Sequence, residues 1–571
     1  MVVLVLVQPP VNRLTVALMA ALTRAWQEVA ADPTVTAVIL RGEGRCFSAG
    51  AAMAEAGQTA LGTLCRRIEE FPRPVFAALH GQVLGAGLSL AMAAHYRIAH
   101  AATVFDLPDV GLGLLPGAGA TQRLPRLVGA EAALRLMLTG AAMTAPEAQA
   151  VGLVDRVVAE HLGEAALAMA QEALPPRPTA GVALRDAARF QAVVAAARLA
   201  DRGNPLPAPA RIIDCVEAAG LLPFEMGLAL EATAFEDLAA SAASQGLRHA
   251  YLAERCALQV PVEAAGHPLP GLASLGVLGA DDPATDLVLQ AITAGLRVTL
   301  CDPDRARLTD ALARIAAGQD LAVAAGQISE DTRDADWARL SSSLAPESLS
   351  GLDLVLAGQG TDTTMLDPGL PSAVIGAAQS GAGLTVPEVR GGLAELSIGA
   401  GSSIEVILRL SALGRQLDWR VVAVGPGGPV ELGLRLALEA AEAHLTRVGH
   451  APDTVAASLA AYGMGPPARH LPPMPRGGLV LVQTCLAALA AEGARMLGDG
   501  RARRPCEIDA VALLSGLMPR WQGGPMFYAD QRGPLVLRAD LQKLEGEVFA
   551  VAPLLDDLIA EGQKFADLDG F

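Results

Sequence analysis

The chain has 571 residues, which at ~100–200 residues per domain predicts about three to five domains rather than a single core. Its residues are 52% hydrophobic and 18% charged, which excludes a disordered protein, and with only 3% aromatic residues the cores must be built from Ala, Leu and Val. A net charge of −17 argues against nucleic acid or an anionic membrane as the partner of the whole chain.

Neither end of the sequence predicts targeting. The first residues, MVVLVLVQPP, are apolar but lack a basic region, and the run is too short to span a bilayer. We expect it to form a buried strand, and the last residues, FADLDGF, are not an obvious address signal. The seven cysteines contain no CxxC pair, so we expect reduced thiols in a cytoplasmic protein without a metal site or a membrane partner.

Pattern divides the chain into regions. Residues 1–165 alternate short apolar runs with helical stretches, which is typical of an α/β domain. Residues 166–268 are Ala-rich and helical by period, and we interpret them as a helical linker region. At 269–400 a second α/β segment opens with LASLGVLGA, and 401–571 is helical apart from VVAVGPGGP and the turn-rich GLMPRWQGGPMFYAD.

The first region carries Gly-rich turns placed before helical runs. CFSAGAA (46–52) and HGQVLGAGLSLAMAAHYRIA (80–99) each combine such a turn with small residues. Backbone N–H groups at such turns are free to donate, and two of them can form an oxyanion hole. FDLPDVGLGLLPGAGATQRLPRLVG (105–129) then places Asp106 and Asp109 ahead of a further Gly-rich turn.

These stretches, in this order, resemble the crotonase (enoyl-CoA hydratase/isomerase) family. LRHAYLAER (247–255), the strand and turn at 275–302, and MPRWQGGPMFYAD (518–530) extend the resemblance to the bifunctional enoyl-CoA hydratase/3-hydroxyacyl-CoA dehydrogenases of fatty-acid β-oxidation. The resemblance covers essentially the whole chain. It implies an α/β chain with a crotonase spiral domain, a helical linker, a Rossmann-like domain at 269–400 and all-α dehydrogenase-type domains at 401–571.

The resemblance implies a coenzyme A thioester as substrate, with no cofactor required in the first domain. The family's oxyanion hole falls on the N–H groups of Ala51 and Ala86. Hydratases of the family use two glutamates, of which the first falls on Ser89 and the second on Asp109. A serine hydroxyl has no useful pKa for acid–base work, so efficient hydration is in doubt.

A single carboxylate is enough to shift a double bond from the 3,4 to the 2,3 position, and family isomerases keep only the second acid. We therefore expect a Δ3-Δ2-enoyl-CoA isomerase with Asp109 as its acid–base group and with weak or no hydratase activity. Asp106 is either a helper of Asp109 or an ordinary loop or cap aspartate, and we interpret His95 as structural.

The middle region resembles a dehydrogenase domain that lacks most of the family's cofactor-binding and catalytic residues. A dinucleotide turn needs the pattern GxGxxG, but here only Gly279 matches, with Asp281 and Ala284 at the second and third glycine positions. Asp302 lies where the acid that binds the ribose is expected, ~20 residues after the turn. We expect a Rossmann-like segment for which NAD binding is doubtful.

The positions of the catalytic residues in that domain differ even more from the family's pattern. The family's general base is a histidine, whose position falls near Ala378, and no histidine occurs between His267 and His444. The partner glutamate is matched by Glu388, and Glu431 stands roughly where an asparagine is expected. Without a base near neutral pKa, hydride transfer from a 3-hydroxyacyl-CoA has no proton acceptor, so we predict no dehydrogenase activity.

Three functions remain open. The first is the acyl-CoA isomerase, the second is a working bifunctional hydratase/dehydrogenase, and the third is a non-catalytic acyl-CoA-binding scaffold. Likeness of fold cannot choose among them. We expect a monomer, with CoA bound by arginines that the sequence does not single out among Arg13, Arg45, Arg66 and Arg67.

Overall fold

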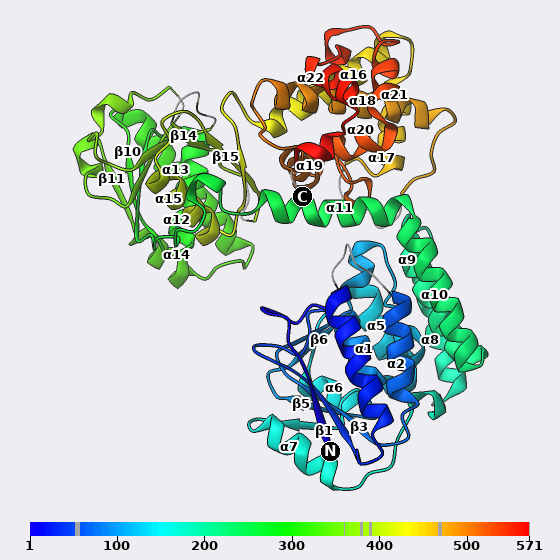
Figure 1. The fold of residues 1–571 in the computed structure, drawn as a ribbon. Coiled ribbons are helices and arrows are strands. Elements are labelled where there is room, and N and C mark those ends of the chain that lie inside the picture. The colour runs from blue at the N-terminus through cyan, green and yellow to red at the C-terminus, as the bar shows by residue number, and fades with distance from the viewer. Residues whose placement is uncertain are drawn as a thin grey trace. The chain divides into compact units, whose positions relative to one another are not determined.

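The computed structural model describes residues 1–51, 58–184, 186–358, 360–376, 378, 381–387, 391–465 and 471–569. These residues form two compact units, unit 1 (Met1–Arg248) and unit 2 (His249–Phe571), each described by itself (Figure 1). The predicted fold class is confirmed, since an α/β unit precedes a Rossmann-like sheet and a helical C-terminal region. The predicted domain boundaries stay a prediction.

Unit 1 is built on a five-stranded parallel sheet of order β1-β2-β3-β5-β8. A smaller sheet has the order β4-β6-β7. The strands are β1 (Val2–Leu6), β2 (Val38–Gly42), β3 (Val75–Leu79), β4 (Gln82–Leu84), β5 (Tyr96–His100), β6 (Val104–Asp106), β7 (Met143–Thr144) and β8 (Arg156–Val158). The expected N-terminal strand is present as β1, but the prediction that it is buried is wrong, because it lies at the edge of the larger sheet with Val3 and Val5 exposed.

Helices cover both faces of this sheet. Met19, Leu22 and Trp26 of α1 join the main core, whereas α7 packs with Phe76 and Tyr96 on the opposite face. The first helices are α1 (Val16–Ala31), α2 (Gln58–Glu69), α3 (Ala86–Ala93), α4 (Ala120–Val128), α5 (Ala130–Thr139), α6 (Ala145–Val151) and α7 (Leu162–Gln171), with a short 3-10 helix, η2 (Pro108–Leu112), before α4.

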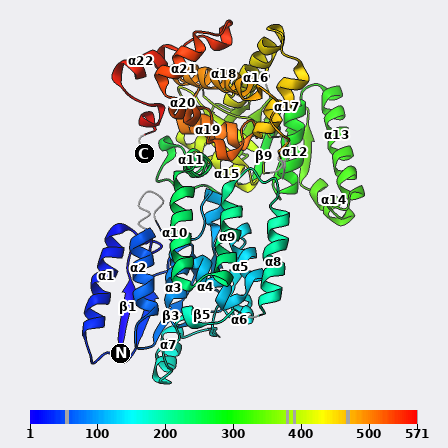
Figure 2. The same ribbon diagram turned by 90° about the vertical axis from the view of Figure 1, so that its right-hand side faces the viewer.

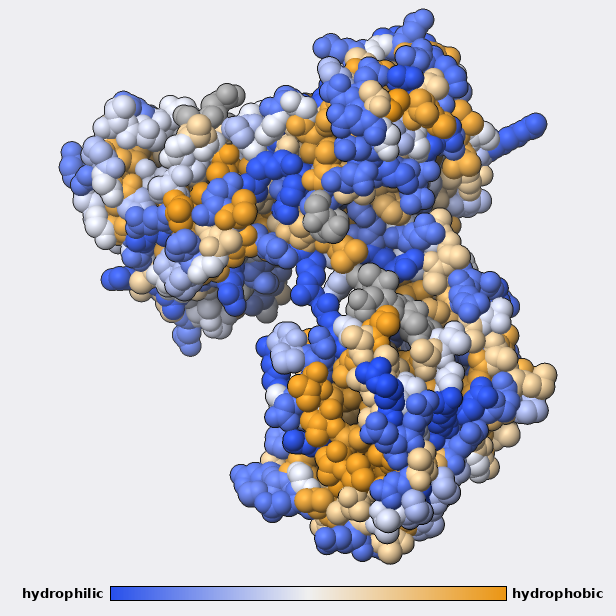
Figure 3. Space-filling model, viewed as in Figure 1, coloured by the Kyte–Doolittle hydropathy of each residue, from blue (hydrophilic) through white to orange (hydrophobic). Residues whose placement is uncertain are grey.

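The segment predicted as a helical linker packs onto unit 1. It contains α8 (Ala187–Ala200), α9 (Pro207–Leu221) and α10 (Phe224–Ala240), which run beside α4 and α5 (Figure 2). Phe190, Ile212 and Phe235 are buried in the same core as the sheet. Apolar side chains also gather on one outer face of unit 1 (Figure 3). Helix α11 (Ala242–Ala257) follows and contains the boundary between the units.

Unit 2 opens with an eight-stranded sheet of order β11-β10-β9-β12-β13-β14-β15-β16. All its pairs are parallel except β14 with β15, and the order outward from β9 is that of a dinucleotide-binding fold. The strands are β9 (Ser274–Leu278), β10 (Arg297–Cys301), β11 (Leu340–Ser343), β12 (Leu354–Ala357), β13 (Ser372–Ile375), β14 (Ala382–Leu384), β15 (Leu393–Ile398) and β16 (Arg420–Val424).

Helices complete unit 2. Strand β16 lies in the stretch predicted as a break in the helical region, because its buried valines pair with β15. The sheet is accompanied by α12 (Asp282–Thr293), α13 (Arg305–Ala324), α14 (Glu330–Trp337) and α15 (Ile404–Gln416). The helical part contains α16 (Val430–Arg447), α17 (Pro452–Tyr462), α18 (Gly478–Gly498), α19 (Pro505–Leu514), α20 (Pro525–Arg532), α21 (Pro534–Leu541) and α22 (Pro553–Glu561).

Helix α18 is the central helix of that part. It alone, among the described residues, is long and apolar enough to cross a membrane by length and composition. Its apolar window is 67% buried, and Leu481, Val482 and Leu489 lie in the core that α16, α20 and α22 also line. This burial is what a core helix of a folded domain requires.

Candidate functional site

The first two Gly-rich turns of unit 1 lie side by side. Ser48 forms an isolated parallel bridge with Val83, and the Leu84 N–H donates to the Ser48 carbonyl oxygen at 3.0 Å. Gly50 has φ +87°, and a Cβ placed on it would lie 3.1 Å from the Leu84 carbonyl oxygen and 3.7 Å from the nitrogen of Ala86. A larger residue at position 50 would therefore push the two turns apart.

Ala51 and Ala86, the expected oxyanion-hole residues, stand at the ends of these turns. Ala86 is the first residue of α3, where backbone N–H groups lack intrahelical partners. Ala51 follows Gly50, whose carbonyl oxygen accepts the Leu14 N–H at 2.9 Å. Within the described parts of the chain, neither the Ala51 nor the Ala86 N–H donates to another group. Both donors are thus available to a ligand.

Asp109 is brought next to these donors by η2. A Cβ placed on Gly85, the residue before Ala86, would lie 3.7 Å from Oδ2 and 3.9 Å from Oδ1 of Asp109. The Oδ2 atom is buried and has no hydrogen-bond partner among the described residues. Burial, together with the nearby charges of Asp106 and Glu231, raises the pKa of Asp109 to about 7.

Ser89, where the family has its first acid, is engaged with the protein itself. It lies one turn into α3, is fully buried, and donates from Oγ to the carbonyl oxygen of Gly117 at 2.9 Å. Its own N–H continues the helix by donating to the Gly85 carbonyl oxygen at 3.0 Å. The hydroxyl therefore ties α3 to the third Gly-rich turn.

Glu231 on α10 is a residue that the sequence analysis missed. Its carboxylate accepts hydrogen bonds from the Gly119 N–H (2.5 Å), the Thr121 N–H (2.8 Å) and Thr121 Oγ1 (2.6 Å), all at the start of α4. Burial raises the pKa of Glu231 above its usual range. No local motif could have revealed it, because 112 residues separate it from Gly119.

Asp106, the possible helper, lies at the end of β6. Its Oδ1 atom is buried without a hydrogen-bond partner among the described residues, and a Cβ on Gly140 would lie 3.9 Å from that atom. Burial raises its pKa. Its side chain therefore adjoins the end of α5 at Gly140, whereas that of Asp109 adjoins Gly85.

His95 agrees with its structural interpretation. Nδ1 accepts the Val75 N–H at 3.0 Å, so Nε2 carries the proton and donates to the Glu69 carbonyl oxygen at 2.9 Å. Burial lowers the pKa of this histidine. The Glu69 carboxylate in turn forms a buried ion pair with Arg123 at 2.8 Å, and Arg123 also donates to the Ala118 carbonyl oxygen at 2.7 Å.

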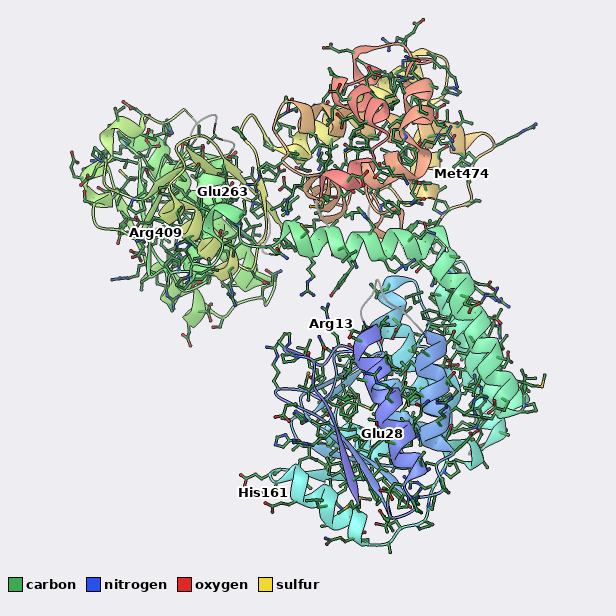
Figure 4. The ribbon with its side chains drawn as sticks, in the orientation of Figure 1. Arg13, Glu28, His161, Glu263, Arg409 and Met474 are labelled. Carbon is green, nitrogen blue, oxygen red and sulfur yellow. The ribbon has the colours of Figure 1, made fainter. Side chains whose placement is uncertain are left out.

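The arginines considered for CoA differ in their surroundings. Arg13 is exposed at the edge of unit 1, near the start of α1 (Figure 4), and it directly precedes Leu14, the bridge partner of Ala51. Arg66 forms an ion pair with Glu225 at 3.2 Å. Arg13 is thus the candidate that adjoins the site through a defined backbone pairing.

In unit 2, the two aspartates of the turn after β9 are bound to other groups of the protein. Gly279 has φ +104°, but Asp281 caps α12 by accepting the Ala284 N–H at 2.9 Å. Asp282 is paired with Arg314 at 3.0 Å. One donor at the start of α12, the Ala284 N–H, is therefore already taken by the Asp281 carboxylate.

Asp302, expected near a ribose, lies at the end of β10. It is buried, with Oδ2 2.9 Å from a guanidinium nitrogen of Arg307 and Oδ1 accepting the Asp304 N–H at 2.9 Å. Oδ1 thus accepts a hydrogen bond, whereas Oδ2 is ion-paired with Arg307 but accepts no hydrogen bond from the described residues.

The position expected for the dehydrogenase histidine holds Ala378, which is buried and whose N–H donates to Ser397 Oγ at 2.9 Å. Glu388 lies outside the described residues. Glu431 stands in the first turn of α16 and pairs with Arg435. Glu395 on β15, which the sequence analysis missed, is buried, accepts the Val430 N–H at 2.6 Å and the Glu431 N–H at 2.9 Å, and has its pKa raised to about 7 by burial.

Two further observations concern metal ligands and the packing of aromatic side chains. Among the residues that the structure describes, no group of three or more His, Cys, Asp or Glu side chains could hold a metal ion. Phe527 stacks on His249 with ring centroids 4.6 Å apart, and Tyr528 packs against the core of the helical part. These aromatic side chains contribute to packing within unit 2.

Comparison with known proteins places these features in context. Residues 1–201 match the family model described as enoyl-CoA hydratase/isomerase. The peroxisomal bifunctional enzyme of Danio rerio is 27% identical over 98% of this chain and 95% of its own length. The protein of the same name from Homo sapiens is 32% identical over 61% of this chain and 50% of its own length, so that match spans half of the relative.

Solved structures also resemble part of the chain. An enoyl-CoA hydratase from Bacillus anthracis is 28% identical over 44% of this chain and 92% of its own, with a TM-score of 0.29. A monofunctional enoyl CoA isomerase from M. smegmatis is 32% identical over 30% of this chain and 79% of its own, with a TM-score of 0.26. The family model and the whole-length relative agree with the resemblance inferred from the motifs. Residues 1–201 are therefore similar to the enoyl-CoA hydratase/isomerase family, in a chain that is similar over nearly its whole length to a peroxisomal bifunctional enzyme.

Proposed function

We propose that unit 1 catalyses the Δ3-Δ2 isomerisation of enoyl-CoA thioesters. Asp109 takes a proton from C2 of the 3-enoyl thioester, and the electron pair moves to the carbonyl oxygen to form a dienolate. The N–H groups of Ala51 and Ala86 hold that oxyanion, for which a single backbone donor is worth about 3–4 kcal/mol. The protonated Asp109 then returns the proton to C4, so that the double bond ends between C2 and C3.

The observation that carries this proposal is the placement of Asp109. Its buried, unpartnered Oδ2 lies beside Gly85, directly before the Ala86 donor. A pKa raised to about 7 lets the same carboxyl act as base and as acid near neutral pH. A single carboxyl that both removes and returns a proton needs a pKa close to the working pH, so that both its charged and its protonated form are accessible.

We further propose that hydration is weak or absent. Syn addition of water requires a second acid–base group, and Ser89 offers only a hydroxyl that already donates to Gly117 at 2.9 Å. Glu231 does not replace that acid, because its carboxylate is occupied by the three donors at the start of α4.

Loss of dehydrogenase activity is part of the same proposal. Three features support it: Asp281 occupies the Ala284 N–H at the start of α12, Asp302 is ion-paired with Arg307, and the buried Ala378 offers no base. Likeness over nearly the whole length to a peroxisomal bifunctional enzyme favours a second candidate, a working hydratase/dehydrogenase. The strand order around β9 favours it as well.

The test is an assay of the full chain with 3-enoyl-CoA, 2-enoyl-CoA and, in the presence of NAD, 3-hydroxyacyl-CoA. We expect double-bond migration that falls by at least about 100-fold in Asp109→Asn, the usual scale for a general acid–base group. Asp237→Asn, an exposed aspartate of α10, is the matched control and should keep full activity. Little hydration and no NADH are expected.

Other outcomes choose among the alternatives. NADH formation from 3-hydroxyacyl-CoA would establish the bifunctional enzyme and refute the loss of the dehydrogenase. Isomerisation that survives in Asp109→Asn would refute the role of Asp109. Acyl-CoA binding without turnover of any substrate would indicate a binding scaffold instead of an enzyme.

A further inference from the structure

Two cysteines that are far apart in sequence meet in unit 2. Cys256 lies in the last turn of α11, and Cys506 lies in the first turn of α19. Their sulfur atoms are 3.4 Å apart. Cys506 is buried, whereas Cys256 is half-buried and open to small reagents. Since a disulfide bond is ~2.0 Å long, a small movement of the two side chains is enough to join them.

A charged group contacts each cysteine of this pair. An Arg504 nitrogen, Nη1, donates to Cys256 Sγ at 3.0 Å, and the same guanidinium pairs with Glu507 at 3.1 Å. A guanidinium stabilises a thiolate, which is the nucleophilic form of cysteine. Cys256 is therefore both the accessible thiol of the pair and the one that a guanidinium contacts.

Cys506 has the opposite environment. Its N–H donates to Asp569 Oδ1 at 2.9 Å, and the second oxygen of that carboxylate is buried. Burial and the charge of Asp569 raise the pKa of Cys506. Cys506 is thus held as a thiol beside a carboxylate that can accept its proton, which suits a second, resolving cysteine.

The remaining thiols lack these features. Burial raises the pKa of three of them to about 12, and every cysteine other than Cys256 is buried. The three are Cys65, Cys215 and Cys485. Selective oxidation therefore has one point of entry among the cysteines of the chain.

We propose that Cys256 and Cys506 form a redox-active dithiol that reduces hydroperoxides and closes to a disulfide between α11 and α19. The Cys256 thiolate attacks the terminal peroxide oxygen, the O–O bond breaks, and the departing alkoxide (hydroxide, for hydrogen peroxide) takes up a proton to leave as an alcohol or water. The Cys506 sulfur then attacks the Cys256 sulfenic acid and the S–O bond breaks, while the Cys506 proton passes by way of Asp569 to the departing hydroxide, which leaves as water. Two thiols and one hydroperoxide thus give one disulfide, one alcohol and one water.

The cycle closes by thiol–disulfide exchange. An external dithiol attacks the Cys256 sulfur, which is the accessible one, and is itself oxidised to a disulfide while both protein thiols are restored. This chemistry is independent of unit 1 and of acyl-CoA turnover. Its failure would leave the proposed isomerase untouched.

The experiment treats the reduced full chain with one equivalent of hydrogen peroxide, blocks free thiols by alkylation and maps the peptides by mass spectrometry. We expect a cross-linked pair of peptides containing Cys256 and Cys506, short of two hydrogen atoms, which disappears after dithiothreitol. Cys301→Ser, the control, should still form it.

Two variants separate the roles. Cys506→Ser should stop at a Cys256 sulfenic acid that reacts with dimedone, and Cys256→Ser should leave Cys506 reduced. The proposal is overturned if wild type gives no Cys256–Cys506 link while its other cysteines oxidise. It is also overturned if Cys506 reacts first in Cys256→Ser, or if Cys256 stays reduced at peroxide levels that oxidise free glutathione.

Discussion

Ser89 on α3 donates its hydroxyl hydrogen to the carbonyl oxygen of Gly117, at 2.9 Å, and both groups are buried. A position that carries an acid in hydratases of the resembled family here serves as a tie between a helix and a Gly-rich turn. On the other side of that turn, Glu231 accepts the Gly119 N–H. The loop before α4 is therefore anchored from two helices. Among the described residues, Asp109 is the carboxyl beside Gly85, and its Oδ2 has no hydrogen-bond partner there.

Replacing Ser89 by alanine tests whether the hydroxyl is a tie or a catalytic group. The Gly117 carbonyl oxygen would keep only its weaker hydrogen bond from the Ala120 N–H at 3.3 Å, so we expect Ser89→Ala to lower the free energy of unfolding by about 0.5–1.5 kcal/mol. Double-bond migration should persist in the folded variant. Urea unfolding and the isomerase assay measure the two effects, and a loss of activity like that of Asp109→Asn would contradict the interpretation.

The pH dependence of isomerisation should report Asp109. Because the carboxylate form removes the first proton, kcat/KM should rise as pH increases and level off above an apparent pKa of about 7. The charge of Glu231 raises the pKa of Asp109, so Glu231→Gln should move the midpoint to lower pH. Rates measured from pH 5 to 9 give both midpoints, and a rate that is already maximal at pH 5 would contradict a raised pKa.

The same carboxyl should influence folding stability in the opposite sense. Its pKa is about 7 in the folded chain against 3.8 in its unperturbed state, so between pH 4 and 7 the folded state binds more protons. Stability from this group is therefore present at low pH and lost as pH rises through 7. In urea unfolding, the free energy of unfolding of Asp109→Asn relative to wild type should increase between pH 5 and pH 8. If this difference between the two proteins is the same at both pH values, the link between the Asp109 pKa and stability is refuted.

Glu231→Ala should be strongly destabilising. It removes the acceptor of three donors in a buried site at the start of α4, and breaking such a network costs about 3–5 kcal/mol. Glu236→Ala on the same helix is the control, because that side chain is exposed and surface changes usually stay within about 0.5 kcal/mol. If the two substitutions lower the urea midpoint equally, the hydrogen bonds of the Glu231 carboxylate do not contribute specifically to stability.

Arg13→Ala should weaken substrate binding without changing the chemistry. Arg13 is exposed and directly precedes the residue that bridges to Ala51, so its charge is available to the CoA phosphates. Removing a charge-assisted contact is expected to raise KM by about 10-fold, equivalent to ~1.4 kcal/mol, with kcat nearly unchanged. Arg24→Ala, farther along α1, removes the same charge and serves as the control. A fall in kcat with constant KM would place Arg13 in another role.

Local motifs predicted the fold class and the candidate residues of the site. The Gly-rich turns determine where backbone donors lie, because Gly50 at φ +87° and Gly85 at φ +49° adopt conformations that other residues rarely take. The absence of a carboxylate at Ser89 and the Asp281 carboxylate in the dinucleotide turn are likewise readable from the chain. Each of these features depends on a few neighbouring residues, which is why sequence alone reveals them.

Contacts between distant segments were decided only by tertiary structure. Glu231 meets Gly119 across 112 residues, and Cys256 meets Cys506 across 250, distances over which no periodicity or motif carries information. The pKa of Asp109 also belongs to this class, since desolvation depends on everything that packs around the carboxyl. The sequence determined which chemical groups are available, and packing decided which of them meet and in which protonation state, because burial and long-range contact are properties of the folded chain.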